Sequence, residues 1–404
     1  MFNEIIKPIL AIAVVSFSAT VALLFSQPSE GLNTCGEPIQ EWEKLTYLAP
    51  SAHDYRPYLN LLGFDNRGNI MVELAQTDGN NSASKFFKSE DHGQRWIQID
   101  KLSSMTSTVN GPSIASPQRS AILYKKESGE YLRSIDGGKH WESPRMLVNG
   151  KPAIDFVTAK AGIKDFDGKV SVVWAGIHPK NPLVIFASFT YSNRNSRGTP
   201  SVTVPIEGLF VSRDGGDNWS LLTTEISASK NTLIPLYPVI GISSSNPKLM
   251  MGYSDFGLVR TTDSGNTWIP VGQRDVLESP AEIEGMSRAV NEFEKQTGRK
   301  SAAPNASMGW RRLFVSQIEF SPTNSMVIYL STNKGLFYTN DGGESWFRLR
   351  VGERRLGEIL SIAINPNEPS EILAGMSTSI YRSTDGGCHF SKMESIGSVS
   401  EAVR

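Results

Sequence analysis

The sequence predicts an all-β protein built from a repeated four-stranded unit, and three observations lead to this prediction. A Ser/Thr-x-Asp-x-Gly-x-x-Trp/Phe motif occurs six times along the 404 residues. Short apolar runs bounded by Gly, Pro, Asn and Asp surround the copies, which is typical of strands joined by tight turns. The 35 glycines and 22 prolines suit a turn-rich chain, and 39% hydrophobic residues are enough for a core.

The spacing of the motif indicates the size of the repeated unit. Consecutive motif Asp residues are 45, 78, 49, 78 and 44 positions apart. The short spacings match a four-stranded propeller blade of roughly 40 to 50 residues, so the long spacings require insertions. The motif residues are Asp91, Asp136, Asp214, Asp263, Asp341 and Asp385.

One unit shows the four expected strands clearly. From Leu313 onward the sequence predicts strands over Val315–Phe320, Val327–Leu330, Gly335–Thr339 and Trp346–Leu349. Radial repetition of such small sheets protects their edges, so we predict a β-propeller of four-stranded blades. Six blades account for the chain, seven are possible if residues 150–170 contain a weak one, and a two-domain sandwich is the alternative.

The motif itself has a structural explanation. An Asp in a turn accepts backbone N–H bonds, and a Gly two residues later allows a positive φ angle. A Ser or Thr hydroxyl two residues before the Asp ties the start of the turn, and the Trp buries a large apolar surface at the start of the next strand. The motif therefore predicts a hairpin between the third and fourth strands and not an active site.

The N-terminus differs from the rest of the chain. Residues from Pro8 to Phe25 carry no charge, and Lys7 precedes them. This length is marginal for a membrane span and long for the apolar part of a signal peptide. We expect residues 1–26 to form an anchor helix or a signal peptide and 27–40 to form a linker. The rest of the chain then lies outside the cytoplasm, periplasmic, lumenal or at the cell surface.

Bulk composition excludes several classes of function. With 40 basic and 41 acidic residues the net charge is −1, so nothing attracts the chain to nucleic acid. The sequence contains no metal-binding motif and no nucleotide-binding loop, so we predict neither a metal nor a cofactor. The propeller is expected over residues 41–396, followed by a short tail over 397–404.

At the six motifs the chain resembles the Asp-box, or BNR-repeat, β-propeller proteins, over about residues 55–396. That superfamily includes sialidases, xyloglucan-active glycosidases, sortilin-type receptors and photosystem II assembly factors of the thylakoid lumen. The resemblance implies that the boxes lie at the periphery, away from the working face.

A sialidase-like site is one consequence of the resemblance. Arg56 falls where the first arginine of such a site is expected, although the isoleucine that should follow it is missing. Asp78 is placed as the acid/base residue would be. No tyrosine nucleophile is supplied, because Tyr381 lies near the Asp-box end of its strand. Further arginines that could bind a carboxylate are Arg311 or Arg312 and Arg354 or Arg355.

Topology predicts which face of the propeller carries the binding site. In an up-and-down blade, the turns between strands one and two and between strands three and four share one face. The three insertions, 145–170, 191–206 and 272–310, fall on the other connections, so we expect them to form the working face. Residues 278–300 read as an amphipathic helix that packs on the propeller or docks a partner. The expected binding residues are Asp155, Asp167, Arg194, Arg197, Arg311 and Arg312.

Closure of the ring is expected to involve the N-terminal region. The segment Glu41–Leu48 resembles a fourth strand without its own repeat, and we expect it to join the last blade. Cys35 precedes this segment and Cys388 lies in the last motif, so the two either form a disulfide or are unrelated thiols.

Together these features favour a binding protein over an enzyme. We expect an extracytoplasmic, membrane-anchored or secreted propeller that acts as a binding or assembly scaffold for a protein or glycan. The alternative is a glycoside hydrolase, sialidase-like or glucan-active, with Arg56, Asp78, Arg311 and Arg355 as candidate catalytic residues. That reaction requires two carboxyl groups about 5 to 10 Å apart.

Overall fold

The computed structural model forms two units, Met1–Cys35 and Gly36–Arg404. Within the first unit it describes Cys35 alone. The residues described in the whole chain are 35, 37–38, 58–65, 67–78, 81–99, 121–127, 130–156, 168–194, 200–223, 225–226, 231–232, 239–254, 257–271, 315–351, 359–376 and 379–393.

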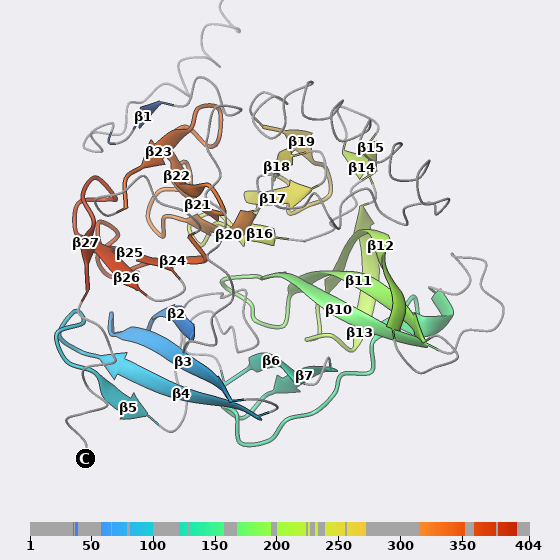
Figure 1. The fold of residues 1–404 in the computed structure, drawn as a ribbon. Coiled ribbons are helices and arrows are strands. Elements are labelled where there is room, and N and C mark those ends of the chain that lie inside the picture. Colours follow the sequence, from blue (N-terminus) through green and yellow to red (C-terminus); the bar gives the residue numbers. More distant parts are fainter. Residues whose placement is uncertain are drawn as a thin grey trace, which may run out of the picture. The chain divides into compact units, whose positions relative to one another are not determined.

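The second unit is built from antiparallel sheets that follow one another along the chain (Figure 1). We number the six main sheets in chain order. The first comprises β2 (Tyr58–Phe64), β3 (Ile70–Asp78), β4 (Asn81–Ser89) and β5 (Ile97–Ile99), and the second β6 (Leu123–Glu127) and β7 (Glu130–Ser134). The third contains β10 (Gly168–Ile177), β11 (Ile185–Arg194), β12 (Pro200–Ser212) and β13 (Asn218–Thr223), and the fourth β16 (Val239–Ile242), β17 (Met250–Ser254), β18 (Gly257–Thr261) and β19 (Ile269–Pro270). The fifth contains β20 (Val315–Phe320), β21 (Ile328–Thr332), β22 (Gly335–Thr339) and β23 (Phe347–Leu349), and the sixth β24 (Ser361–Ile364), β25 (Ile372–Gly375), β26 (Ile380–Ser383) and β27 (Ser391–Lys392). A small hairpin, β14 (Glu225–Ile226) and β15 (Asn231–Thr232), follows the third sheet.

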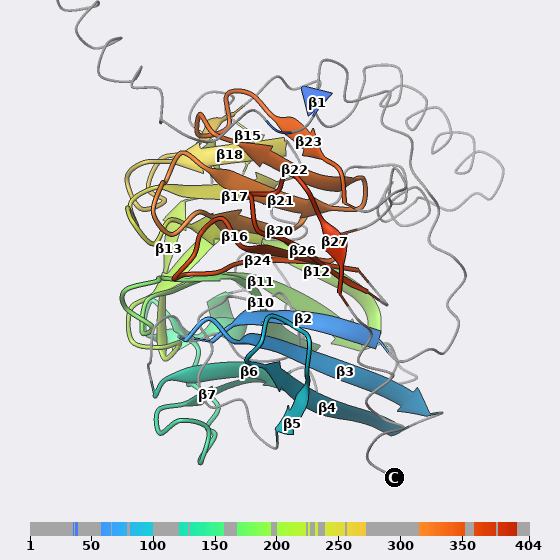
Figure 2. The same ribbon diagram turned by 90° about the vertical axis from the view of Figure 1, so that its left-hand side faces the viewer.

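The sheets are arranged radially, and in the five four-stranded sheets the first strand is innermost. β10 contacts β16, β16 contacts β20, β20 contacts β24, and β24 contacts β2. β7 of the second sheet contacts β10, and Figures 1 and 2 both place β6 and β7 beside the first sheet. This radial repetition of antiparallel sheets is the arrangement of a β-propeller, as predicted.

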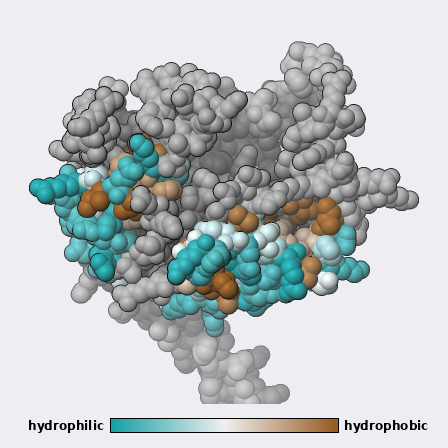
Figure 3. All heavy atoms as spheres, turned by 90° about the horizontal axis from the view of Figure 1, so that it is seen from below, coloured by the Kyte–Doolittle hydropathy of each residue, from teal (hydrophilic) through white to brown (hydrophobic). Residues whose placement is uncertain are grey.

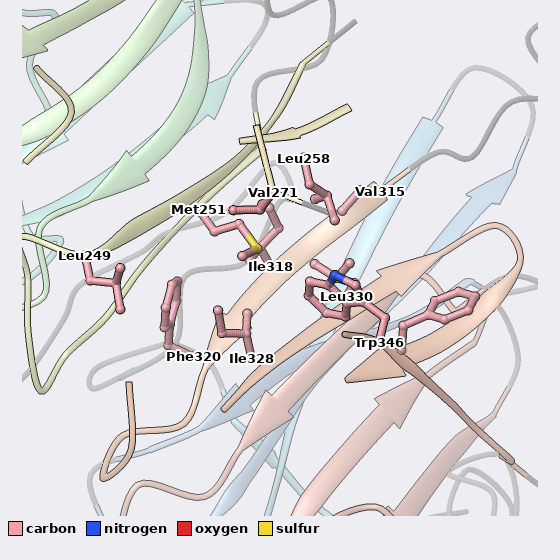
Figure 4. Packing of buried hydrophobic residues seen from close by; sticks show 11 residues of the cluster. Leu249, Met251, Leu258, Val271, Val315, Ile318, Phe320, Ile328, Leu330 and Trp346 are labelled. Carbon is pink, nitrogen blue, oxygen red and sulfur yellow. The ribbon is translucent and has the colours of Figure 1, made fainter. Parts of the chain in front are cut away.

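Neighbouring sheets bury apolar side chains between them. One such cluster lies between the fourth and fifth sheets, where Leu249, Met251 and Val271 face Ile318 and Phe320 (Figure 4). These side chains alternate along short strands, so each sheet presents one apolar face to each neighbour. The described surface in Figure 3 is mostly hydrophilic, with separate hydrophobic spots and no broad apolar band.

The predicted unit agrees closely with the fifth sheet. β20 and β22 have the predicted bounds, and β21 and β23 each begin one residue later than predicted. The predicted insertion 191–206 is largely a continuation of the hairpin between β11 and β12, which pair from Ile185↔Ser212 to Arg194↔Pro200. Alternating Val, Thr and Tyr residues explain why this segment is extended and paired.

The beginning of the predicted insertion 145–170 does not lie on the expected face. β8 (Leu147–Val148) pairs in parallel with β13, and β9 (Lys151–Pro152) folds back on β8. The Leu147 N–H donates to the Asp217 carbonyl at 2.8 Å, and the Asn149 N–H donates to the Trp219 carbonyl at 3.3 Å. These bonds satisfy carbonyl groups along the outer edge of β13. This part of the segment therefore covers the sheet edge beside the motif turn.

Several predicted segments fall mainly on residues that the structure does not describe. They are 1–26, most of 27–40, Glu41–Leu48, 272–310 and 397–404. In the part of 27–40 that is described, β1 (Glu37–Pro38) pairs with β23. No helix among the described residues is long and apolar enough to cross a membrane. Cys35 and Cys388 are both disulfide-bonded and are the two cysteines of the chain, so the predicted bridge is present.

Candidate functional site

The six motif turns, which we call Asp turns, share one hydrogen-bond pattern. In the third sheet, the Ser212 hydroxyl donates to Asp214 Oδ1 at 2.9 Å and accepts the Gly216 N–H at 2.8 Å. The Asn218 N–H donates to the same carboxylate at 2.9 Å, and the Trp219 indole N–H donates to the Gly216 carbonyl at 2.8 Å. The first three bonds recur in the turns of Asp91, Asp136, Asp263, Asp341 and Asp385. The predicted hydrogen bonds of the Asp and of the Ser or Thr are thus present in all six turns. The aromatic residue is buried in four of them, at Trp96, Trp219, Trp268 and Trp346, and half-buried at Trp141 and Phe390.

Two features of the Asp turns were not predicted. The residue after the Asp also has a positive φ angle, and it is Gly in four turns, His92 (φ 58°) in the first and Ser264 (φ 64°) in the fourth. In addition, the side chain four residues after the Asp bonds to Asp Oδ2 in five of the six turns. The residues that make this bond are His140, Asn218, Thr267, Ser345 and His389.

The Asp turns are tied to the turns between the first and second strands. The N–H of the residue after the Asp donates to the carbonyl of the residue two positions before the second strand. Examples are Gly215 to Leu183 at 2.9 Å and Gly342 to Met326 at 2.9 Å. The second, fourth and sixth sheets make the same bond. These two sets of turns therefore share one face, as predicted, and their polar groups are engaged in holding each sheet together.

The structure describes the candidate site residues unevenly. Asp78 is the last residue of β3, and Arg194 is the last residue of β11, so both backbones end at turns between second and third strands. In Figure 2 the β3 arrow points to the right-hand edge, opposite the turns beside β13 and β18. Asp155 is exposed in the helical residues 153–156, whose Phe156 packs edge-on against Phe210. Arg56, Asp167, Arg197, Arg311, Arg312, Arg354 and Arg355 lie outside the described residues.

Metal chemistry finds no support in this part of the chain. No group of three His, Cys, Asp or Glu side chains among the described residues is placed to hold a metal ion.

Tyr381 lies on β26 and pairs with Lys392 near the Asp turn of the last sheet, on the strand where it was expected.

A carboxyl group that sequence reasoning missed lies on an innermost strand. Glu319 belongs to β20 and is half-buried, and it points to the same side of the strand as Gln317. The Gln317 amide donates to Glu319 Oε2 at 3.3 Å, while its own oxygen accepts the Ile362 N–H of β24 at 3.0 Å. Glu319 therefore lies at the junction between the fifth and sixth sheets.

The equivalent residues in the other four-stranded sheets are small. Glu319 pairs with Tyr329, the second residue of its neighbouring strand. The residues with the same register are Gly63, Gly176, Gly241 and Ala363. A Cβ atom on Gly241 would lie 2.7 Å from the Ile318 carbonyl oxygen, so glycine here allows neighbouring innermost strands to approach closely. Glu319 places a long polar side chain where the other sheets have almost none.

The surroundings of Glu319 change its acidity. Burial raises the pKa of its carboxyl to about 8, and the hydrogen bond from Gln317 offsets only part of this effect. The group is therefore mostly protonated at neutral pH and can donate a hydrogen bond or a proton. Every other described Asp or Glu with a resolved change has a lowered pKa, as Asp214, Asp341 and Glu371 illustrate. A half-buried acid with a raised pKa is a candidate functional group.

The sequence does contain a signal for Glu319. Aligned at the end of the first strand, the repeats read "LGFD", "AGIH", "IGIS", "IEFS" and "IAIN", so a glutamate replaces a small residue in one copy. Comparing each position across the repeats would have identified it, whereas searching for catalytic motifs could not.

Comparisons with known proteins add little to this description. No family model and no curated protein sequence matches the chain. Among solved structures, an ancestral GH74 enzyme is 15% identical, with a TM-score of 0.39, over 71% of this chain and 32% of that one. The GH74 xyloglucanase from Xanthomonas campestris is 14% identical, with a TM-score of 0.25, over 85% and 49%. An extracellular domain from B. thetaiotaomicron is 13% identical, with a TM-score of 0.36, over 89% and 34%.

The chain thus spans between a third and a half of the length of these three structures. At such low TM-scores, the evidence for the fold is the arrangement of this chain's own sheets.

Proposed function

We propose that this chain is an extracytoplasmic β-propeller of six blades with Asp-box repeats, held at a membrane by its N-terminal segment, that binds a protein or glycan as a scaffold for assembly. The observation that carries the proposal is the division of the turns between two faces. One face is occupied by Asp turns whose polar groups bond within and between sheets. The opposite face carries the connections that vary in length, which is where binding usually occurs on a rigid scaffold.

The disulfide supports the proposed compartment. Disulfides persist in oxidising environments outside the cytoplasm, and Cys35 and Cys388 are both bonded.

The long hairpin of β11 and β12 is the described element best suited to contact a partner. Its strands remain paired up to Arg194↔Pro200. The other described hairpins between second and third strands are shorter, except that of β3 and β4, which ends at Asp78↔Asn81. We assign Arg194 and Arg197 to the binding surface, together with Asp167, Arg311 and Arg312.

The test shortens this hairpin without disturbing the sheet. Replacing residues 192–203 by Asn-Gly leaves Tyr191 opposite Val204, a paired position that a two-residue turn can close. The purified propeller domain is used as bait on detergent-solubilised membranes and on a glycan array, and captured molecules are quantified against the unmodified protein. A second variant lacks residues 278–300.

A matched control changes the Asp-turn face. Ile135 is 61% exposed within the Asp turn of the second sheet, and Ile135→Ser removes an apolar contact there. We expect loss of binding in the hairpin variant or the 278–300 deletion, and wild-type binding in Ile135→Ser, with all three melting cooperatively. Binding that survives both deletions and disappears in Ile135→Ser would show that the roles of the faces are reversed.

Glu319 favours one second candidate, a glycoside hydrolase. Its raised pKa suits a general acid, which must be protonated at neutral pH. However, burial causes the rise in its pKa against the opposing effect of the Gln317 hydrogen bond, and no second carboxylate among the described residues contributes to it. A panel of chromogenic sialosides and glucosides tests this candidate. Hydrolysis by the wild type that is lost in Glu319→Gln would replace the scaffold proposal.

A further inference from the structure

The junction between the first and sixth sheets, which we call the seam, is where the ring closes. The described strands β2–β5 come from the N-terminal part of the chain and β24–β27 from the C-terminal part, and no described strand is shared between the two sheets. β2 contacts β24 and β25 across the seam. Near the Asp-turn face, Gly68 of the first sheet lies against the side chains of Asn365 and Asn367. Closure in the described part therefore depends on side-chain contacts.

Three other junctions use one kind of link. A side chain of the preceding sheet donates to a backbone carbonyl in the next Asp turn, either that of the Asp or that of the following residue. Arg133 donates to the Asp214 carbonyl at 2.7 Å, and Arg260 donates to that of Gly342 at 2.8 Å. The further examples are Tyr131 to Gly215 and Tyr329 to Gly386.

The seam is linked in the opposite direction and by charged groups. Arg382 stands three residues before Asp385, which is the position that Arg133 and Arg260 have in their own sheets. Its Nε, however, donates to Glu371 Oε1 of the same sheet at 2.6 Å. The same oxygen lies 2.9 Å from His92 Nδ1 in the Asp turn of the first sheet. Asn365 donates to the second carboxylate oxygen at 2.6 Å.

Glu371 is held as a buried anion at this position. Its side chain is 1% exposed, whereas that of His92 is 48% exposed. Burial alone would raise the pKa of Glu371, but the hydrogen bonds from Asn365, Arg382 and His92 outweigh it and the pKa is lowered. An ionised, buried carboxylate requires its partners, so loss of one of them is costly.

His92 occupies a backbone conformation that favours glycine. Its φ angle is 58°, and Gly137, Gly215, Gly342 and Gly386 stand at this position in four other Asp turns. A non-glycine residue in the left-handed region costs about 1 kcal/mol relative to glycine. A histidine here therefore reduces backbone stability, and the contribution that its side chain makes is the contact with Glu371 across the seam.

We propose that His92, Glu371 and Arg382 form a latch that closes the ring, and that the seam opens when the His92–Glu371 contact is lost. The latch replaces the backbone link of the other junctions. Loss of the His92–Glu371 contact leaves the bonds of Arg382 and Asn365 to Glu371 in place, so the seam is then held by the apolar contacts of Leu61 with Ala363 and Leu373. The seam is therefore a conformational device built into the closure of the ring.

Substitution by glycine separates the latch from the backbone effect. His92→Gly installs the residue found in four other Asp turns and removes the contact with Glu371. Backbone strain alone predicts a more stable protein, whereas the latch predicts a seam that opens more often. The matched control is Ser264→Gly, because Ser264 stands at the same position of the fourth Asp turn with a φ angle of 64°. It gives the backbone effect of the substitution without the contact across the seam.

Hydrogen–deuterium exchange of the disulfide-intact protein is the measurement. We expect exchange about tenfold faster in His92→Gly for peptides covering β2 and β24, and no change for peptides covering β16 and β20. In a Glu371→Gln background, His92→Gly should add little further change, because the contact is already weakened. The proposal is overturned if His92→Gly slows or leaves unchanged the exchange at the seam, or if it acts equally in both backgrounds.

Discussion

The Tyr131 hydroxyl donates a hydrogen bond to the carbonyl oxygen of Gly215, 3.3 Å away, although the two residues belong to different sheets. Tyr131 is buried on β7, and Gly215 follows the Asp of the next Asp turn with a φ angle of 77°. The positive φ angles of the Asp turn thus turn a carbonyl towards the preceding sheet. A motif that folds one hairpin also supplies the acceptor that joins it to its neighbour.

Removing this hydroxyl should weaken the junction between the second and third sheets. We expect Tyr131→Phe to lower the free energy of unfolding by about 1 kcal/mol, since the ring packing is retained and one buried hydrogen bond is lost. Urea denaturation followed by tryptophan fluorescence measures the change. Tyr381→Phe is the control, because Tyr381 is half-buried and its hydroxyl has no described partner. An equal effect of both substitutions would show that the bond is unimportant.

The hydroxyl at the start of an Asp turn should contribute more than an exposed one. The Thr261 side chain donates to Asp263 Oδ1 at 2.7 Å and accepts the Gly265 N–H at 3.0 Å, and the residue is 1% exposed. Thr261→Val leaves a buried N–H without its acceptor, so we expect a loss of about 1 to 3 kcal/mol in unfolding free energy. The neighbouring exposed Thr262→Val should change it by less than about 0.5 kcal/mol. Chemical denaturation of the two variants side by side decides between these outcomes.

The Asp turns should make the protein sensitive to acid. Each of the six Asp-turn carboxyls has a lowered pKa. For Asp91 and Asp136 the largest cause is the hydrogen bond from the backbone N–H four residues later. For the other four, burial would raise the pKa, but the hydrogen bonds to the carboxylate lower it by more. A lowered folded-state pKa contributes stability above the unfolded value of about 3.9, and this is lost as pH falls through the folded value. The urea midpoint should therefore decline mainly below about pH 4. A midpoint that stays constant down to pH 2 would contradict the role of the carboxylates.

Glu319 should have the opposite pH dependence. Its folded-state pKa is raised to about 8 from 4.5, so as pH rises the carboxyl loses its proton in the unfolded chain before it does so in the folded protein. The free energy of unfolding therefore falls progressively as pH rises from about 4.5 to 8. Glu319→Gln keeps the hydrogen-bonding shape and removes the titration. We expect the variant to be more stable at pH 8 by an amount on the order of a few kcal/mol, and nearly unchanged at pH 4. Parallel stability profiles from pH 4 to 8 would refute the assignment.

The innermost glycines should tolerate a methyl group in proportion to the space around them. A Cβ atom would meet the Ile318 carbonyl oxygen at 2.7 Å in Gly241→Ala, but the Ile240 carbonyl oxygen at 3.2 Å in Gly176→Ala. Neither glycine has a positive φ angle, so packing is the main cost. We expect a loss of about 2 to 3 kcal/mol for Gly241→Ala and about 1 kcal/mol for Gly176→Ala. Thermal unfolding gives the order, and the reverse order would show that the strands can move apart.

Local chemistry explains which parts of the fold were predictable. The pattern around Asp214 predicts the turn and its Ser212 tie, because each of these interactions spans four residues or fewer. The parallel pairing of Leu147 with Asn218 could not be predicted, since it depends on which sheet edge is left open once the ring has formed.

The site was harder to predict than the fold for a similar reason. The acidity of Glu319 results from burial against a neighbouring sheet, and the contact of His92 with Glu371 joins residues at opposite ends of the propeller. Motif reasoning examines neighbours in sequence, whereas both features arise from neighbours in space. Arg56 and Arg355 lie outside the described residues and remain predictions.

Because each main sheet is formed largely from one continuous stretch of chain, the order of the sheets does not depend on where the chain begins. A circularly permuted gene that joins the present ends through a flexible linker and opens between β19 and β20 would keep all the strands of the fourth and fifth sheets together. In such a permutant the present seam becomes an ordinary covalent connection, and the His92–Glu371 contact becomes dispensable.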